Sequence, residues 1–497
     1  MKWSHYQEAI FDFTLNDTRN GIVEACPGSG KSTVIAECVR RLPSNIKVLA
    51  LTFTCLARDQ LKAKLEPYEN ATVCNLNGFG NSCFRGYKKV NKFKVSNIFK
   101  YKVMKLEDYD KERFKTFKRH EATIVRLIGL LKSQMVFTDE DFQKNWREIA
   151  TVYDVTLPEE SLEFEDYLRQ VFNLDRKQLN PIDFDDQIAV PIRENWAITT
   201  YDNVLVDEAQ DLTPCQIELS RRAIALGGRS LFVGDRNQSI YFFRGADSRA
   251  MDNIKLMLDA EELPLNICYR CSKAVVRAAQ LVVPGIEYHE NAPEGKVENM
   301  DLKDYRLHVE SGDFILCRTT APLVRECLMF IRMGIPANVK GREIGEDMKK
   351  IVDAVSKGEE RMSIETFLPL LHKYYDTQIE KLKKLNSEEK RILLDDKIDT
   401  ITVLCEDALV VEDINKRFDE IFTDSDVTSV ILLMTGHKAK GLENRNVYIL
   451  RPDLLPHKLA KSEEALVQER NLKFVMITRS MMNLYWVHGG ETKSVED

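Results

Sequence analysis

The sequence predicts an α/β protein built on parallel sheets. Short apolar runs, typical of strands buried on both faces, alternate with patterns typical of helices. A glycine-rich loop joins the first of these strands to the helix that follows it. The chain has 497 residues, of which 44% are apolar and 30% charged. It therefore has the composition of a folded protein and the length for more than one domain.

In chain order, strands are expected at residues 20–26, 46–53, 201–209, 230–235, 313–319 and 427–435, and helices at 31–42 and 56–65. Two stretches interrupt the alternation. Residues 85–180 are charged, aromatic and mostly helical, and residues 342–425 are helical and rich in Lys and Glu. We therefore expect two α/β domains, each with a mainly helical insertion. The first domain is expected at 1–84 and 181–255 with its insertion at 85–180, and the second at 256–341 and 426–497 with its insertion at 342–425.

The sequence carries no pattern for export or membrane insertion. The start, "MKWSHYQEAIFDF", has no basic region followed by an apolar one. No run approaches the roughly 18 uncharged apolar residues that a membrane helix needs. We expect a cytoplasmic protein without membrane contact.

The cysteine pattern argues against a disulfide framework. Eleven cysteines are scattered along a long chain, whereas such frameworks belong to short secreted chains. One pair, Cys268 and Cys271 in "ICYRCS", has the spacing of a zinc knuckle or a redox pair. No second pair follows to complete four zinc ligands, which disfavours the zinc interpretation.

The net charge of −7 disfavours nucleic acid as a partner, but the charge is uneven along the chain. From Arg85 to His120 there are thirteen Lys or Arg residues against four acids, and aromatic residues lie among them. Basic charge mixed with stacking rings suits a polynucleotide. A solvated basic surface over core aromatics would produce the same pattern, so both interpretations stay open here.

The glycine-rich loop, "GIVEACPGSGKST", predicts a phosphate site. It follows the P-loop pattern except that Ala25 takes the place of the first glycine. Backbone N–H groups of such a loop, together with the helix N-terminus, surround phosphates. Lys31 is expected at the β- and γ-phosphates, and Ser32 at Mg²⁺. The residues expected at the nucleotide are Pro27, Gly28, Ser29, Gly30, Lys31, Ser32 and Thr33.

A second part of this site is expected after a later strand. The apolar run in "NVLVDEAQD" ends in Asp207 and Glu208. At the carboxyl edge of a parallel sheet, Asp207 can coordinate Mg²⁺. Glu208 can orient or deprotonate an attacking water.

Further segments occur in the order known from one family. They include "WSHYQ", "FVGDRNQSIYFFRGAD" (residues 232–247), "LNICYRCS", "MTGHKAKGLE" and "ERNLKFVMITRS". With them the chain resembles the UvrD/Rep-type DNA helicases of superfamily 1, from Trp3 to about residue 488. The resemblance implies two RecA-like motor domains that use ATP and Mg²⁺. It also implies binding to single-stranded and partly duplex DNA, unwinding in the 3′→5′ direction, and a nucleoid location or, for a viral protein, the host cytoplasm.

The resemblance also assigns roles to individual residues. At the nucleotide it implies Gln7 for adenine, Tyr269 stacked on adenine, Glu443 toward the ribose, and Gln238, Arg270 and Arg479 at the γ-phosphate. At DNA it implies Phe53, Asn77, Tyr241, Phe243 and His437. Asn77 stands where the family usually has His, and Phe243 where Trp is common. The cysteines of "CYRC" flank Tyr269 and Arg270, and we expect them to be small apolar residues packed nearby.

Two other functions are consistent with these residues. A DNA-stimulated ATPase could remodel protein–DNA complexes without productive unwinding. A non-catalytic P-loop scaffold would lack hydrolysis altogether, although Lys31, Asp207, Glu208, Gln238 and Arg479 are all present.

Overall fold

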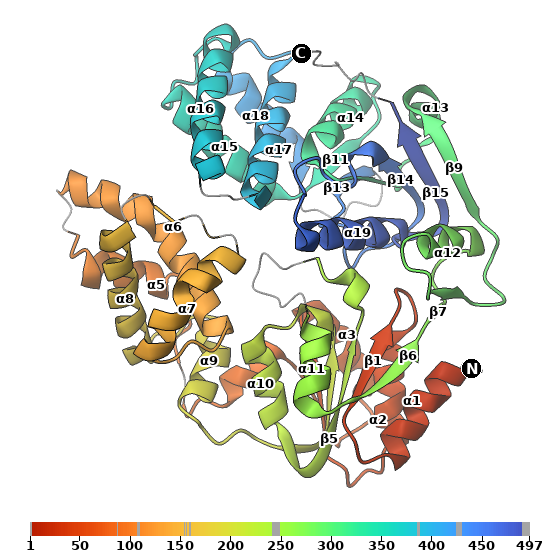
Figure 1. The fold of residues 1–497 in the computed structure, drawn as a ribbon. Helices are drawn as coiled ribbons and strands as arrows, with labels where there is room; N and C mark the ends of the chain where they lie inside the picture. Colours follow the sequence, from red (N-terminus) through yellow and green to blue (C-terminus); the bar gives the residue numbers. More distant parts are fainter. Residues whose placement is uncertain are drawn as a thin grey trace. The chain divides into compact units, whose positions relative to one another are not determined.

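The computed structural model describes residues 2–86, 88–106, 110–153, 155, 157–158, 161–240, 249–384, 388–423 and 430–489. They form two compact units, Met1–Asn266 and Ile267–Asp497. Figure 1 draws each unit as a parallel sheet covered by helices. The predicted α/β fold with parallel sheets is confirmed.

The sheet of the first unit has the strand order β3-β2-β4-β5-β1-β6, and every pair is parallel. Its strands are β1 (Gly21–Ala25), β2 (Val48–Thr52), β3 (Ala71–Asn75), β4 (Tyr201–Asp207), β5 (Ile224–Gly234) and β6 (Glu261–Leu265). The carboxyl ends of these strands share one edge, which brings the residues after β1, β4 and β5 together.

Two helical layers cover this sheet because successive strand residues point to opposite faces. Val23 and Ala50 pack into a core with α1 (His5–Asn16), α2 (Lys31–Arg41) and α3 (Cys55–Leu65). Ile22 and Leu49, one position before each, pack into a second core. That core is covered by α4 (Leu76–Ser82), α9 (Asp186–Arg193), α10 (Pro214–Arg222) and α11 (Ala250–Leu258).

The structure corrects one predicted boundary. The first domain was expected to end at residue 255, but the units divide between Asn266 and Ile267. Strand β6 is the reason: it pairs with β1 along its whole length, from Gly21 with Glu261 to Ala25 with Leu265.

The first insertion has a core of its own. It contains α5 (Lys94–Asn97), the π-helix η1 (Ile98–Val103), α6 (Lys111–Ser133), α7 (Asp139–Val152) and α8 (Ser161–Lys177). Phe99, Leu127, Trp146 and Leu168 are buried together at its centre. Its ends lie side by side, since Asn91 N donates to Ile182 O at 2.8 Å.

The sheet of the second unit has the order β12-β11-β13-β10-β14-β15-β9 and is parallel throughout. Its strands are β9 (Lys296–Asp301), β10 (Phe314–Cys317), β11 (Ala337–Lys340), β12 (Phe422–Thr423), β13 (Ile431–Thr435), β14 (Asn444–Leu450) and β15 (Ser480–His488). Outside the second insertion lie α12 (Lys273–Gln280), α13 (Leu302–His308), α14 (Thr320–Arg332) and α19 (Glu463–Ile477), with the short pair β7 (Ile267–Cys268) and β8 (Glu287–Tyr288).

The second insertion consists of α15 (Arg342–Ser356), α16 (Ile364–Lys384), α17 (Glu388–Cys405) and α18 (Val411–Ile421). Unlike the first insertion, it shares one core with its sheet. Met348, Phe367 and Ile401 from these helices belong to the same buried cluster as Ile315 and Leu433 from β10 and β13. Among the described residues of the whole chain, no helix is long and apolar enough to cross a membrane.

Candidate functional site

The glycine-rich loop connects β1 to α2 and requires two glycines. Gly28 has φ +70° and Gly30 has φ +84°, a left-handed conformation that strongly favours glycine. Ala25 is the last residue of β1, and it is not among the residues with positive φ. The departure from the P-loop pattern at Ala25 therefore leaves the loop conformation intact.

The loop also contains a buried hydroxyl group that a phosphate ligand could bind. Ser29 is fully buried, and its Oγ has no hydrogen-bond partner among the described residues. A buried hydroxyl without a partner is costly, and a phosphate oxygen would satisfy it. The N-terminus of α2, which begins at Lys31, adds its dipole at the same place.

The two acids expected beside this loop lie there. Strand β4 ends at Asp207, and Ser32 Oγ donates to Asp207 Oδ2 at 3.0 Å. Lys31 Nζ lies 3.6 Å from Glu208 Oε2. Burial, followed by the nearby Glu208, raises the pKa of Asp207 to about 6. The Ser32 and Asp207 oxygens are donors of the type that Mg²⁺ prefers, and a cation there would offset the crowded negative charge.

Gln238 is connected to Glu208 through a chain of hydrogen bonds. Gln238 is 6% exposed, and its Nε2 donates to Asp235 Oδ2 at 2.7 Å. Asp235 N donates to Gln210 Oε1 at 2.9 Å, and Gln210 Nε2 donates to Glu208 Oε2 at 2.5 Å. Sequence analysis missed Gln210, although a glutamine two residues after a predicted catalytic acid was a usable signal.

Gln7 reaches the loop from α1. It belongs to a capping box in which its Oε1 accepts from Ser4 N at 3.0 Å and its N donates to Ser4 Oγ at 3.3 Å. A Cβ built on Gly30 would lie 3.8 Å from Gln7 Nε2, so the carboxamide lies beside the phosphate loop. Lys64 Nζ of α3 donates to Thr33 Oγ1, in the first turn of α2, at 3.4 Å.

The UvrD/REP helicase N-terminal domain family matches residues 7–258, about half of the chain. The chain belongs to the UvrD/REP helicase family. The family expected from the motifs is therefore confirmed.

Known relatives carry helicase names. The chain is 25% identical over 388 residues to the ATP-dependent DNA helicase PcrA of Staphylococcus epidermidis, covering 67% of this chain and 51% of PcrA. It is 27% identical over 309 residues to the F-box DNA helicase protein 1 of Schizosaccharomyces pombe, covering 57% and 33%. It is 24% identical over 303 residues to the probable DNA helicase II homolog of Mycoplasma pneumoniae, covering 55% and 41%. The chain spans about half the length of the PcrA relatives it matches.

The second unit holds the arginines that the UvrD/REP resemblance assigned to the γ-phosphate. Arg479 is 2% exposed, and its guanidinium donates to Leu442 O at 3.1 Å and Val475 O at 3.0 Å. Arg270 forms an ion pair with Glu443, the residue assigned to the ribose. Tyr269 is 39% exposed, and the centroid of its ring lies 4.9 Å from that of His289. The second unit therefore brings Arg270 and Glu443 into direct contact.

The cysteines that flank Tyr269 and Arg270 are buried. Cys271 N donates to Cys268 Sγ at 3.4 Å, and Cys271 Sγ contacts Thr478 O at 3.7 Å, next to Arg479. They belong to no group of described His, Cys, Asp and Glu residues with the geometry of a metal site. Their packing agrees with the expectation of small buried residues.

The residues assigned to DNA lie in different surroundings. Phe53 is half-buried against the core of the first unit. Asn77 Nδ2 donates to Phe184 O at 2.8 Å and to Gln187 Oε1 at 3.1 Å. His437 is half-buried, and desolvation followed by the Arg318 charge lowers its pKa to about 3.

Two other DNA assignments, Tyr241 and Phe243, lie outside the described residues. Phe184, whose backbone carbonyl accepts from Asn77, is 55% exposed and was not singled out from the sequence. An aromatic residue within the otherwise acidic "DFDD" was the available signal.

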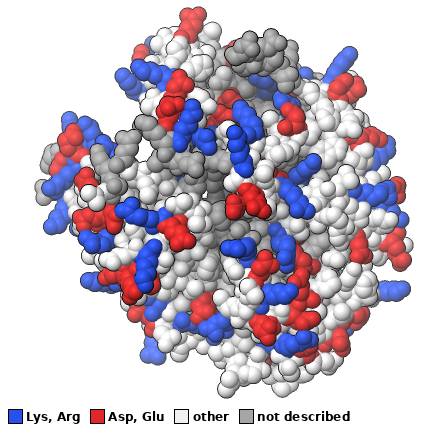
Figure 2. Space-filling model, viewed as in Figure 1, with Lys and Arg blue, Asp and Glu red and all other residues white. Residues whose placement is uncertain are grey.

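The basic and aromatic stretch divides between core and surface. Phe84, Phe99 and Phe117 are buried, as the core interpretation requires. Phe93, Tyr101 and Phe114 are 57%, 58% and 46% exposed, and lysine ammonium groups lie over all three rings. Figure 2 shows Lys and Arg interspersed with Asp and Glu on the visible face, without one continuous basic patch.

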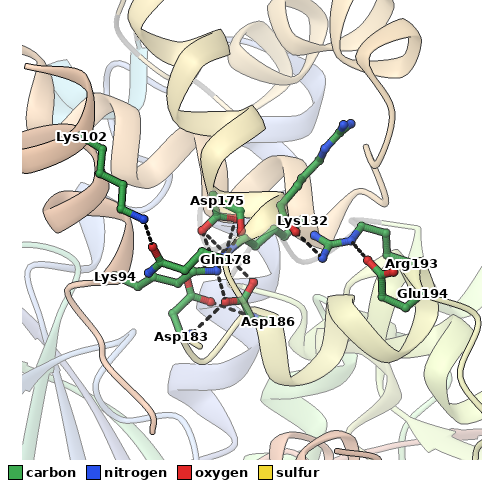
Figure 3. A network of polar contacts seen from close by, with 10 residues as sticks. Lys94, Lys102, Lys132, Asp175, Gln178, Asp183, Asp186, Arg193 and Glu194 are labelled. Carbon is green, nitrogen blue, oxygen red and sulfur yellow. Dashed lines mark hydrogen bonds and ion pairs between the residues drawn. The ribbon is translucent and has the colours of Figure 1, made fainter. Parts of the chain in front are cut away.

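A buried ionic cluster joins the first insertion to the start of α9 (Figure 3). Lys132 Nζ of α6 lies 2.7 Å from Asp183 Oδ2 and 2.8 Å from Asp186 Oδ1. Lys94 Nζ of α5 lies 2.6 Å from Asp186 Oδ2 and 3.0 Å from Asp175 Oδ1. The three aspartates could hold a metal ion by their spacing, but the two ammonium groups already supply the positive charge. Phe184 and Gln187, the partners of the Asn77 amide, directly follow Asp183 and Asp186 in the chain.

Proposed function

We propose that this chain is an ATP-driven motor on single-stranded DNA that separates duplex DNA, moving in the 3′→5′ direction. The observation that carries the proposal is the convergence of Lys31, Ser32, Asp207 and Glu208 at one sheet edge in a UvrD/REP family member. The names of the relatives support ATP and DNA as substrates.

Hydrolysis follows from the roles these groups can take. The loop N–H groups and Lys31 would hold the β- and γ-phosphates. Ser32 and Asp207 would hold Mg²⁺, which neutralises phosphate charge when bound. The water oxygen attacks the γ-phosphorus while the bond between the γ-phosphorus and the β–γ bridging oxygen breaks. Glu208 accepts one proton from the attacking water.

Charge on the transferring phosphoryl group needs further neutralisation. We assign this to Arg270 and Arg479, since an arginine in this role is typically worth about 10³–10⁵ in rate. Glu443, already paired with Arg270, would exchange this partner for the ribose when the nucleotide binds.

The grip on DNA is proposed to rest on aromatic side chains. Stacking contributes roughly 1–3 kcal/mol per base and does not depend on sequence, which suits a motor that must traverse any strand. Phe53 and the exposed Phe184 are candidates in the first unit, and His437 would contact DNA as a neutral imidazole because its pKa is lowered.

The test combines ATP hydrolysis with strand separation. We expect single-stranded DNA to stimulate hydrolysis strongly, and a partial duplex with a 3′ tail to be opened in preference to one with a 5′ tail. Hydrolysis that does not respond to DNA would refute the motor. Preference for the 5′ tail would refute the direction, and RNA substrates measured in parallel would decide the type of nucleic acid.

A second function, remodelling of protein–DNA complexes without unwinding, is favoured by one observation. Asn77 replaces the usual His, and its amide is already bonded to Phe184 O and Gln187 Oε1. Displacement of streptavidin from biotinylated single strands, without opening of tailed duplexes, would support this second function over the first.

A further inference from the structure

We infer that Gln210 is a positioning residue that holds Glu208 in its hydrolytic orientation and links it to Gln238. The inference deepens the proposed function and rests on it, because it concerns the residue expected to activate water. Gln210 is 1% exposed and lies in the short 3-10 turn (Ala209–Asp211) that follows β4.

The hydrogen bonds determine how the Gln210 amide is oriented. Its Oε1 accepts from Asp235 N at 2.9 Å, and a main-chain N–H can only donate. The Nε2 must therefore face the other way, where it donates to Glu208 Oε2 at 2.5 Å. If the amide were flipped, its oxygen would face the Glu208 carboxylate and its NH₂ group would face the Asp235 N–H. Both contacts would be repulsive, so Asp235 and Glu208 enforce the same orientation.

Glu208 needs such support because of its backbone. It has φ +56°, a left-handed conformation uncommon for a residue with a side chain. Lys31 Nζ and Gln210 Nε2 both contact its Oε2, at 3.6 Å and 2.5 Å. One hydrogen bond and one ion pair on the same oxygen restrain the position of the carboxylate, and aligning a water requires such restraint.

The fold makes room for this amide. A Cβ added at Gly234, the last residue of β5, would lie 2.7 Å from Gln210 Oε1 and 3.0 Å from Gln210 N. Only glycine permits this approach of β5 to the turn after β4. The glycine at position 234 thus allows the contact between Gln210 and Asp235.

Through Asp235 the contact extends to the γ-phosphate sensor. Gln238 Nε2 donates to Asp235 Oδ2 at 2.7 Å, and Ser239 Oγ lies 3.5 Å from Gln210 O. Three hydrogen bonds, two of them buried, therefore join Gln238 to Glu208. A shift of Gln238 on phosphate binding would reach Glu208 by this route, so that water activation follows correct phosphate placement.

A purely structural role for Gln210, tying β4 to β5, is separable by substitution. Gln210→Glu keeps an oxygen for Asp235 N but places a second carboxylate oxygen against Glu208. Gln210→Met has similar length and loses the side-chain hydrogen bonds to Asp235 N, Glu208 Oε2 and Asp211 Oδ2. If Gln210 only ties the strands, Gln210→Glu behaves as wild type. If it positions Glu208, Gln210→Glu is at least as impaired as Gln210→Met.

The first measurement is steady-state ATP hydrolysis by the full chain with a poly-dT oligonucleotide. We expect Gln210→Glu to lower kcat by about 10²-fold, the effect of misplacing a reacting group by about 1 Å, with KM for ATP unchanged. The control is Gln216→Met, which removes a capping contact to Thr213 N at 2.9 Å on α10 and should leave kcat unchanged. Wild-type kcat in Gln210→Glu would overturn the inference.

A second measurement does not depend on turnover. ADP with aluminium fluoride mimics the transferring phosphoryl group, so the wild type should bind it more tightly than ADP. We expect Gln210→Glu to bind ADP with the affinity of the wild type, but to bind ADP with aluminium fluoride no more tightly than ADP alone. Absence of DNA-stimulated turnover in the wild type would refute the proposed function alone. A gain retained in Gln210→Glu, or absent in the wild type, would refute the positioning role.

Discussion

His437 has a side chain whose charge is set by its surroundings. Desolvation, followed by the positive Arg318, lowers its pKa from 6.5 to about 3, so the imidazole is neutral in the folded protein near pH 7. Folding therefore favours the neutral form. The stability that this contributes is present above the unfolded pKa of about 6.5 and is lost progressively as the pH falls toward 3.

This yields a prediction on pH. Between pH 7 and pH 5, His437 should cost the wild type up to about 2 kcal/mol of unfolding free energy, from 1.36 kcal/mol per pH unit below 6.5. The His437→Gln variant should lack this contribution to the loss of unfolding free energy between pH 7 and pH 5. Urea unfolding of both proteins at the two pH values measures it, and equal losses would contradict the assignment.

The residues proposed to act in ATP hydrolysis permit a second prediction. Glu208→Gln should lower kcat by about 10²–10⁴-fold, the usual contribution of a general base, and Lys31→Ala should abolish turnover because the phosphates lose their cation. Neither side chain is assigned to DNA, so the affinity for a fluorescent single-stranded oligonucleotide should be unchanged. Turnover at the wild-type rate in either variant would refute these roles.

The "CYRC" segment provides a third prediction. Cys268→Ala with Cys271→Ala keeps small apolar groups in buried positions and should retain most hydrolysis. Arg270→Ala removes the positive charge proposed to neutralise the transferring phosphoryl group, so it should strongly reduce ATP hydrolysis. Stoichiometric zinc in the wild type, measured by atomic absorption, would contradict the assignment of the cysteines as packing residues.

At the scale of elements, the ionic cluster joins three insertion helices to the start of α9. Lys132 pairs with Asp175, Asp183 and Asp186, all of them buried. Removal of one partner from a buried ion pair leaves uncompensated charge and typically costs about 3–5 kcal/mol. The insertion is therefore attached to the sheet-containing part of the first unit through its electrostatics as well as through the chain.

The prediction is that Lys132→Met lowers the free energy of unfolding by about 3–5 kcal/mol. Lys144→Met is the matched control. Lys144 lies on α7 of the same insertion and pairs with exposed Glu140, a contact worth less than about 1 kcal/mol. Urea unfolding midpoints compare the two, and similar midpoints would show that the cluster does not stabilise the fold.

At the scale of the molecule, the two insertions differ in how they pack. Helices α6–α8 enclose a core separate from the sheet, whereas α15–α18 share one core with β10 and β13. Helices that share a core should unfold with it as one cooperative unit. The second insertion is thus a part of its domain's interior, although its sequence looked like an added segment.

Native-state hydrogen exchange tests this difference. We expect amides of α15, α16 and α18 to open with the same free energy and denaturant dependence as those of β10 and β13. Amides of α6 and α8 should open with lower free energies than those of β1 and β4. Independent opening of α15–α18 would contradict the shared core.

The sequence alone determined the class of fold, the glycine-rich loop between a strand and a helix, the paired acids after a strand, and the family. These depend on short spacings, such as glycines before Lys31 and adjacent acids after an apolar strand, and local conformation follows directly from such patterns. Tyr241 and Phe243 remain sequence-based predictions.

Only the tertiary structure decided which distant residues meet. Lys94 and Asp186 are 92 positions apart in the chain. Strand β6 pairs with β1, more than 200 residues before it. Gln210 accepts a hydrogen bond from Asp235, the residue directly after the neighbouring strand β5. The tertiary structure also separated buried from exposed aromatics and bonded the amide of Asn77 within the protein. Strand order and burial follow from packing of the whole chain, which no local pattern encodes.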